Sequence, residues 1–274
     1  MDFSVPTFVK WAGGKKQLLQ EIVRFKPKKF NNYIEPFVGG GAVYFFVQKN
    51  YDGRAFISDI NQELITTFKI IRDKPLELIK LLKEHRKNHN KEYYYKIRDD
   101  FDIEKSTPLE IAGRFIYLNK TCFNGLYRVN SKGKFNVPIG SYKNPSIFNE
   151  KDLIIASKLL KRTEINVADF KEVVNHAKKG DFVYFDPPYL PISKTSNFTS
   201  YTKKTFLEKE QKELAEVFKV LNKKGCFVML SNSDHPLIKN LYSGFNFHTV
   251  KANRAISCIG SGRGKINELI ITNY

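Results

Sequence analysis

The run FVYFDPPY, residues 182–189, decides the fold expected of this chain. Its first half, Phe182–Phe185, is apolar and rich in aromatic residues, which predicts a short buried strand. The two prolines that follow fix the backbone and cannot donate to a sheet ladder, so the strand ends at Asp186. Ligands of open α/β sheets bind at the carboxyl ends of the strands. The run therefore predicts an α/β fold with a binding site at this turn.

Six further short apolar runs predict strands, and they alternate with helix-like segments such as 15–24, 62–71 and 206–221. This alternation indicates βαβ units and a mostly parallel sheet with helices on both faces. The last run closely follows another strand, and we expect it to pair antiparallel at the end of the sheet. The expected strands are Tyr33–Glu35, Ala55–Ser58, Glu164–Val167, Phe182–Phe185, Cys226–Ser231, Phe245–Val250 and Glu268–Thr272.

The middle of the chain breaks this alternation. From about residue 73 to residue 157 the pattern is helical, with one long polar and aromatic loop at 122–145. A structureless connection of that length is uncommon unless it has a function. We therefore expect a mainly helical domain, 73–157, inserted into a sheet domain made of 1–72 and 158–274.

The net charge is the most informative feature of the composition. The 274 residues contain 46 Lys and Arg against 28 Asp and Glu, a formal charge of +18. Such an excess favours a polyanionic partner, above all nucleic acid, although a solubilising lysine surface gives the same count. Hydrophobic residues make up 42%, which excludes a disordered tail or a collagen-like chain.

The sequence shows no sign of a membrane, a disulfide framework or a metal. No apolar run approaches the length of a membrane span, and the chain does not begin with a signal-peptide pattern. The three cysteines are far apart, and the five histidines have no metal-binding spacing. We expect a cytoplasmic protein without contact to a membrane and without a bound metal.

The turn after the predicted strand has the chemistry to hold an amino group on a flat ring. The Asp186 carboxylate and the Pro187 carbonyl are acceptors for its two hydrogens, and the Tyr189 ring offers a stacking surface. A proline turn that merely ends a strand is the alternative. The candidate catalytic residues are Asp186, Pro187, Pro188 and Tyr189.

Two glycine-rich runs predict a cofactor site. EPFVGGGA at 35–42 lies between a strand and a helix, where glycines let the backbone approach a ligand. Asp59 ends the next strand, a position from which an acid commonly binds ribose hydroxyls. The spacing is not GxGxxG, and KWAGGK at 10–15 is not a Walker A loop, which disfavours NAD and ATP. The pattern suits the adenosine half of S-adenosylmethionine, or a glycine turn without function.

The stretch from residue 114 to residue 143 is basic and aromatic and contains no Asp or Glu. This composition is typical of DNA backbone and groove contacts, and Arg128 is the best candidate for a bidentate contact to guanine. A solvated basic hairpin has the same composition. The residues concerned are Arg114, Lys120, Arg128, Lys132, Lys134 and Lys143, with Phe115, Tyr117, Phe123, Tyr127, Phe135 and Tyr142.

The order KWAGGK, EPFVGGGA, SDIN, a long insertion and DPPY resembles the alpha group of DNA adenine-N6 methyltransferases, and most of all the deoxyadenosine methylases that modify adenine in GATC. The similarity extends from about residue 8 to residue 274 and includes FNGLYRVNSKGKFNVP, NFTSYT and FVMLSNSD. It implies a Rossmann-like methyltransferase fold with a seven-stranded sheet and an inserted target-recognition domain. It also implies methyl transfer from S-adenosyl-L-methionine to adenine N6 in double-stranded DNA, after the base has been flipped out of the duplex.

The resemblance carries over to individual residues. It implies that the methyl donor is bound by Trp11, Ala12, Gly13, Gly14, Lys15, Glu35, Pro36, Phe37, Gly39, Gly41, Asp59 and Asp186. It implies contacts to DNA from Lys10, Phe123, Asn124, Leu126, Arg128 and Pro138, and Phe198 and Tyr201 are candidates for the wall of the base pocket.

Several alternatives stay open on the sequence alone. They are an amino-methyltransferase acting on cytosine N4 or on RNA, an enzyme that binds another nucleotide cofactor, and a non-catalytic DNA-binding protein with a vestigial pocket. A cognate restriction endonuclease, paired in function rather than by contact, is a further partner that the sequence leaves open.

Overall fold

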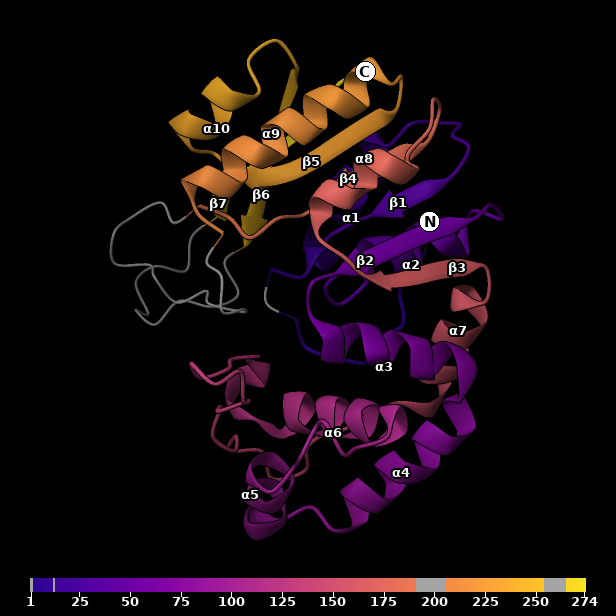
Figure 1. The fold of residues 1–274 in the computed structure, drawn as a ribbon, viewed down its shortest axis with the longest axis vertical. Coiled ribbons are helices and arrows are strands. Elements are labelled where there is room, and N and C mark those ends of the chain that lie inside the picture. The colour runs from indigo at the N-terminus through magenta and orange to yellow at the C-terminus, as the bar shows by residue number, and fades with distance from the viewer. Residues whose placement is uncertain (1, 12, 191–205, 254–264) are drawn as a thin grey trace.

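The computed structural model describes residues 2–11, 13–190, 206–253 and 265–274. Its strands are β1 (Tyr33–Glu35), β2 (Ala55–Asp59), β3 (Thr163–Val167), β4 (Phe182–Phe185), β5 (Phe227–Ser233), β6 (Asn246–Asn253) and β7 (Lys265–Thr272). They form a seven-stranded sheet in the order β3-β2-β1-β4-β5-β7-β6, shown in Figure 1. Strands β1 to β5 are parallel, whereas β7 is antiparallel to both β5 and β6. The mostly parallel seven-stranded sheet expected from the sequence is confirmed.

The position of the last strand differs in one respect from the expectation. β7 is antiparallel as predicted, but it lies between β5 and β6 and not at the end of the sheet. Its apolar run Leu269, Ile270 and Ile271 is fully buried, with side chains in both apolar clusters, a pattern typical of an interior strand. β6 is more polar, with Asn246, His248, Thr249 and Lys251 among its residues, and tolerates the edge position.

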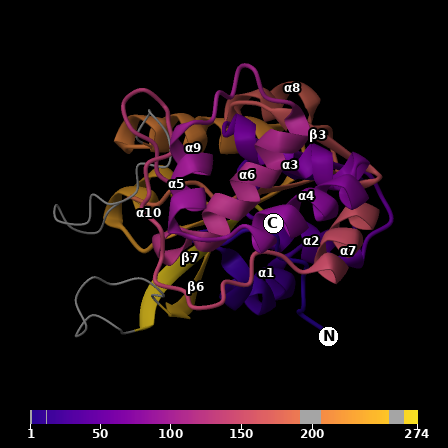
Figure 2. The same cartoon turned by 90° about the horizontal axis from the view of Figure 1, so that it is seen from below.

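Helices cover both faces of the sheet, as predicted. In β4, Phe182 and Tyr184 enter one apolar cluster, whereas Val183 and Phe185 enter the other, because successive side chains of a strand point to opposite faces. In the described ranges, no helix is both long and apolar enough to cross a membrane. The helices are η1 (Lys15–Leu18), α1 (Leu19–Phe25), α2 (Ala42–Lys49), α3 (Gln62–Asp73), α4 (Pro75–Lys87), α5 (Lys91–Asp99), α6 (Pro108–Thr121), η2 (Phe123–Gly125), α7 (Glu150–Leu160), η3 (Phe170–Glu172), α8 (Val173–His176), α9 (Glu208–Lys223) and α10 (Pro236–Leu241). Figure 2 shows α8 and α9 on the opposite side of the sheet from α1 and α2.

The middle of the chain is helical. Residues 73–157 contain α4 to α6 and most of α7, and their only β-pairing is in the isolated bridges Cys122–Ile139 and Val129–Phe135. α6 packs on α3, and α4 and α5 pack on α6, so these helices lie on the side of α3 away from the strands (Figure 1). One apolar cluster continues from the sheet through α3 into α6. The division into a sheet domain and an inserted domain stays a prediction, with α3 as the element that the two parts share.

Candidate active site and nucleic-acid interface

The Asp186 carboxylate lies where β4 ends between β1 and β5. Its Oδ1 atom forms an ion pair with Nζ of Lys15, 2.7 Å away. Among the described residues this buried oxygen has no further polar partner, so it keeps an acceptor position. Burial raises the pKa of Asp186 to about 6, although the Lys15 ammonium opposes the shift. A buried acceptor in this condition is suited to an N–H donor from a ligand.

The Tyr189 ring is fixed by two contacts. Its hydroxyl donates a hydrogen bond to Oε2 of Glu268 in β7 at 2.8 Å. The Lys15 ammonium lies 4.7 Å from the ring centroid, over one face. Lys15 thus contacts both the Asp186 carboxylate and the Tyr189 ring, and its Nζ also donates to the Gly13 carbonyl at 2.8 Å.

Two buried amides hold the proline turn, and the sequence analysis missed both. Gln211 of α9 and Asn232 of β5 are each 0% exposed. Nδ2 of Asn232 donates to Oε1 of Gln211, and Nε2 of Gln211 donates to the Pro188 carbonyl, each at 3.0 Å. Buried polar side chains persist where they are hydrogen-bonded, so this pair fixes the carbonyl direction. The sequence feature that could have identified them is an uncharged polar residue within an otherwise apolar face of α9 and of β5.

The glycine turn after β1 presses against Trp11. Gly39 has a φ of +47°, and a Cβ atom there would lie 2.7 Å from Nε1 of Trp11, so only glycine fits. Oδ2 of Asp59 accepts from the Gly39 N–H at 3.2 Å, and its Oδ1 accepts from the Asn61 N–H at 3.0 Å. Burial raises the pKa of Asp59 to about 6, against the lowering effect of these N–H groups. The turn thus joins Trp11 to the carboxylate at the end of β2.

Glu35 is the third buried carboxyl group near the turn. Its Oε2 accepts a hydrogen bond from the Tyr33 hydroxyl at 2.7 Å, and the side chain is buried. Burial raises the pKa of Glu35 well above its usual range, and the charge of Asp186 adds to the shift. Glu35 and the buried Pro36 stand at the start of the turn. The ring of Phe37, the next residue, stacks on Phe170 with centroids 5.4 Å apart.

The residues expected to contact DNA gather on the loop after α6. The Phe123 N–H donates to the Pro138 carbonyl at 2.9 Å, and the Leu126 N–H donates to the Phe123 carbonyl at 3.2 Å. The Phe123 side chain is 48% exposed. Asn124 has a φ of +53°, the only positive value among described residues other than glycine. Strained backbone of this kind is concentrated at functional sites.

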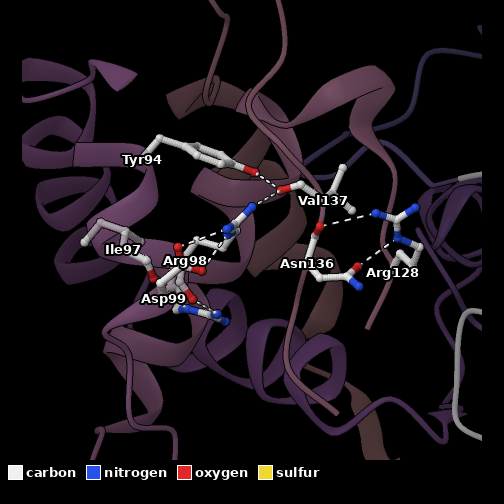
Figure 3. Close-up of polar contacts among 8 residues, drawn as sticks. Tyr94, Ile97, Arg98, Asp99, Arg128, Asn136 and Val137 are labelled. Atoms are coloured by element: carbon white, nitrogen blue, oxygen red, sulfur yellow. Dashed lines mark hydrogen bonds and ion pairs between the residues drawn. The ribbon is translucent and has the colours of Figure 1, made fainter. Parts of the chain in front are cut away.

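Arg128 and Lys10 are held at the same loop. In Figure 3, Arg128 is bonded to Asn136: its Nε donates to Oδ1 at 2.8 Å and its Nη2 to the carbonyl at 3.3 Å. The buried Asn119 joins Lys10 to the loop, because its Nδ2 donates to the carbonyls of both Lys10 and Gly125. Nζ of Lys10 donates to the Tyr142 hydroxyl at 3.1 Å. Asn119 was not predicted as a site residue, and Tyr142 was named only among the aromatic residues of the basic stretch.

The structure corrects part of the basic stretch. Arg114 is buried and forms an ion pair with Glu63 of α3, with Nη1 and Oε2 3.0 Å apart, so it is not part of an exposed basic surface. Four of the six aromatic residues of the stretch also belong to the core and not to a surface: Phe115, Tyr117, Tyr127 and Phe135. Lys120 is half-buried, and the exposed cations are Arg128, Lys132, Lys134 and Lys143.

Three predicted site residues lie outside the described residues. They are Ala12 in the first glycine run, and Phe198 and Tyr201 in the segment after the proline turn. Their roles stay predictions.

The fold and the site together define a Rossmann-like α/β enzyme of the methyltransferase type. A sequence model of the family D12 class N6 adenine-specific DNA methyltransferase matches residues 11–256, and the chain belongs to this family. As a member of this family, the chain is an enzyme that transfers a methyl group from a methyl donor to adenine N6 in DNA. This membership decides against the cytosine-N4, RNA and non-catalytic alternatives.

Three relatives show how far the similarity extends. The chain is 47% identical over 272 residues to the Type II methyltransferase M1.LlaDCHI of Lactococcus lactis subsp. cremoris, covering 97% of this chain and 95% of the relative. It is also 47% identical to the Type II methyltransferase M.MjaIII of Methanocaldococcus jannaschii, covering 98% and 99%. The DNA adenine methylase of Vibrio cholerae is 38% identical, covering 96% and 94%.

Proposed function

We propose that this enzyme transfers a methyl group from S-adenosyl-L-methionine to N6 of an adenine flipped out of double-stranded DNA, at a GATC target. The observation that carries the proposal is the buried Asp186 oxygen, whose only polar partner within the described part of the chain is the Lys15 ammonium that also lies over the Tyr189 ring. A flat ring with an amino group satisfies both groups at once.

The residues around the glycine turn fit the proposed donor. Asp59 uses one acceptor position on each oxygen for backbone N–H groups, and a carboxylate has about four, so positions remain for ribose hydroxyls. Ile60, which follows it, is apolar and 50% exposed, which suits the face of a purine, although the sequence analysis did not single it out. Asp186, which is ionised above about pH 6, supplies negative charge near a cationic ligand. When bound, S-adenosylmethionine supplies an electrophilic methyl group on sulfur.

The residues of the proline turn act on the amino group. The N6 lone pair of adenine is delocalised into the ring, which makes it a poor nucleophile. Asp186 and the Pro187 carbonyl accept the two N6 hydrogens and favour a pyramidal nitrogen with a localised lone pair. Gln211 already occupies the Pro188 carbonyl, so the Pro187 carbonyl is the second acceptor in our proposal. Asp186 acts mainly as an acceptor and orienter, because the methylated nitrogen is acidic and loses its proton readily.

The target base must leave the helix to reach this turn. Extruding a base costs a few kcal/mol, and stacking on an aromatic ring recovers roughly 1–3 kcal/mol. Lys15 covers one face of Tyr189, so the flipped adenine stacks on the opposite face in our proposal.

The loop after α6 reads the target in the same proposal. Phe123, Asn124, Leu126, Arg128 and Pro138 lie together there, and Lys10 is tied to the loop through Asn119. Exposed lysines at 132, 134 and 143 supply phosphate contacts, which position the protein without reading sequence. The Type II names of two relatives support a cognate restriction endonuclease as a functional partner, one whose cleavage this methylation blocks.

Plasmid methylation tests the proposal. The protein is incubated with plasmid and S-adenosylmethionine, and the product is challenged with two nucleases that respond oppositely to methylated GATC. Nucleoside digestion then identifies the modified base. N6-methyladenine with an unchanged response at GATC would reject the proposed target, and no methyl transfer from this donor would reject the proposed cofactor.

Substitution of Gly39 by alanine is expected to weaken donor binding by at least about tenfold. The new methyl group would lie 2.7 Å from Trp11 Nε1 and displace the ring that lines the site. Gly244→Ala is the matched control, because Gly244 also has a positive φ but no atom within 4 Å of the added Cβ. Both variants bear a left-handed backbone cost of roughly 1 kcal/mol. Calorimetric titration should show the affinity loss in the first variant only.

Arg128→Ala is expected to relax the sequence preference by about 1–3 kcal/mol at one base pair, since a guanidinium discriminates guanine by a bidentate contact. Lys132→Ala, an exposed lysine of the same loop, should instead weaken binding equally for all sequences. Methylation rates on duplexes that vary each target position provide the measurement. An unchanged preference profile for Arg128→Ala would place base reading elsewhere.

A further inference from the structure

Glu268 is a carboxylate that the reaction described above does not use. It is the only acidic residue after Asp234 in the sequence. β7 runs antiparallel to β5, so the first half of β7 lies at the edge of the sheet where the parallel strands end. Glu268 pairs with Ser233, the last residue of β5, and this register brings it to the same edge as Asp186.

Glu268 holds the stacking ring. The Tyr189 hydroxyl donates to its Oε2 atom at 2.8 Å, and both side chains are partly or fully buried. Burial, together with the charges of Asp186 and Glu268, raises the pKa of Tyr189 well above its usual range. The hydroxyl therefore stays protonated and continues to donate. With Lys15 over one face, this bond leaves the ring little rotational freedom.

Glu268 also contributes to the charge around Asp186. The Lys15 ammonium lowers the pKa of Asp186, whereas the negative charge of Glu268 raises it. Three further titratable groups face this carboxylate: Glu35, whose own pKa is raised mainly by burial, and the tyrosines Tyr33 and Tyr184. Lys15 and Glu268 are thus opposing influences from two different elements, η1 and β7.

We propose that Glu268 is a positioning residue for methyl transfer, which orients the Tyr189 ring and places a negative charge at the edge of the sheet where Asp186 lies. The proposal rests on the role of Asp186 as the N6 acceptor given above. Asp186 accepts its N6 hydrogen fully only when ionised, so activity falls as the pH decreases through its pKa. Because the charge of Glu268 raises that pKa, neutralising Glu268 should let activity persist to lower pH.

Two variants separate the charge of Glu268 from its hydrogen bond. Glu268→Gln removes the charge but keeps an oxygen that accepts from Tyr189. Tyr189→Phe removes the hydrogen bond but keeps the charge. The measurement is single-turnover methylation of duplex DNA by the full chain, at saturating donor and from pH 5 to pH 8. It gives the acidic limb of the pH–rate profile, the range in which the rate falls as the pH decreases. We expect Glu268→Gln to shift that limb by about half a pH unit toward acid, and Tyr189→Phe to lower the rate severalfold without moving the limb.

The outcomes that contradict the proposal are distinct. An acidic limb of Glu268→Gln that coincides with the wild-type limb overturns it, and so does an equal shift in Tyr189→Phe. Should Glu268→Gln fail to fold, Glu268→Asp replaces it, because this variant keeps the charge and must keep the limb while it slows the reaction. Asp186→Asn is measured in parallel. If that variant retains wild-type turnover, the proposed function itself fails. If it loses turnover while Glu268→Gln leaves the limb in place, only the role of Glu268 is rejected.

Discussion

Replacement of Asp186 by alanine is expected to lower the rate of methyl transfer by about a hundredfold to a thousandfold or more, with DNA affinity broadly unchanged. The substitution removes a preorganised acceptor at the atom where charge develops, and the loss of one such group typically costs this factor. The residues proposed to contact phosphates and the groove lie on the loop after α6 and not at this turn, so we expect binding to persist. Single-turnover kinetics with labelled donor and a fluorescence titration with duplex DNA measure the two quantities. Loss of DNA binding with turnover preserved at saturation would contradict the assigned role.

The same variant changes stability in two opposing ways, because it leaves the buried Lys15 ammonium without its carboxylate but also removes a carboxyl group whose burial is unfavourable. Burial raises the pKa of Asp186 from 3.8 to about 6. A carboxyl whose folded pKa is raised costs stability as the pH increases through that window, and the full cost is present above about pH 6. Removing it relieves this cost, a trade of stability for activity that is common at active sites. Asp186→Asn keeps the shape and one acceptor oxygen, so it should show an intermediate rate and exclude unfolding as the cause.

Much of the fold could be predicted because its signals are local in the sequence. Each strand is a short apolar run with a polar or glycine turn beside it, as in Phe182–Phe185 before Asp186. The order of strands in the sheet depends instead on contacts between distant segments. The apolar run Leu269 to Ile271 indicates a strand buried on both faces, but its position between β5 and β6 depends on pairing with those two segments.

The candidate site divides in the same way. The proline turn could be predicted because its acceptors and its ring are adjacent in the chain. The approach of Lys15 to Asp186 and of Trp11 to Gly39 joins elements far apart, and no spacing rule gives it. The prediction that Arg114 belongs to a DNA-contact surface was wrong for the same reason. Composition does not show whether a charged side chain faces solvent or pairs with a buried acid from a distant part of the chain.

Arg114→Leu is therefore expected to destabilise the fold by about 3–5 kcal/mol, because it leaves Glu63 buried without its cation. Arg114 also donates to the Ile97 and Arg98 carbonyls, and Glu63 accepts from the Tyr127 hydroxyl at 3.1 Å, so the loss reaches several elements. Urea unfolding measures the change. The double variant Glu63→Leu with Arg114→Leu should recover most of it, since replacing both partners by apolar residues is often close to neutral.

An exposed ion pair supplies the control. Lys212 pairs with Glu208 across one turn of α9, both side chains are more than half exposed, and Lys212→Ala should cost less than about 1 kcal/mol. An equally small cost for Arg114→Leu would mean that the buried pair is not structural. Salt dependence separates the two roles further. If Arg114 bound a DNA phosphate, its removal would reduce the slope of log affinity against log salt by about one, whereas removal of a residue buried against Glu63 leaves that slope unchanged.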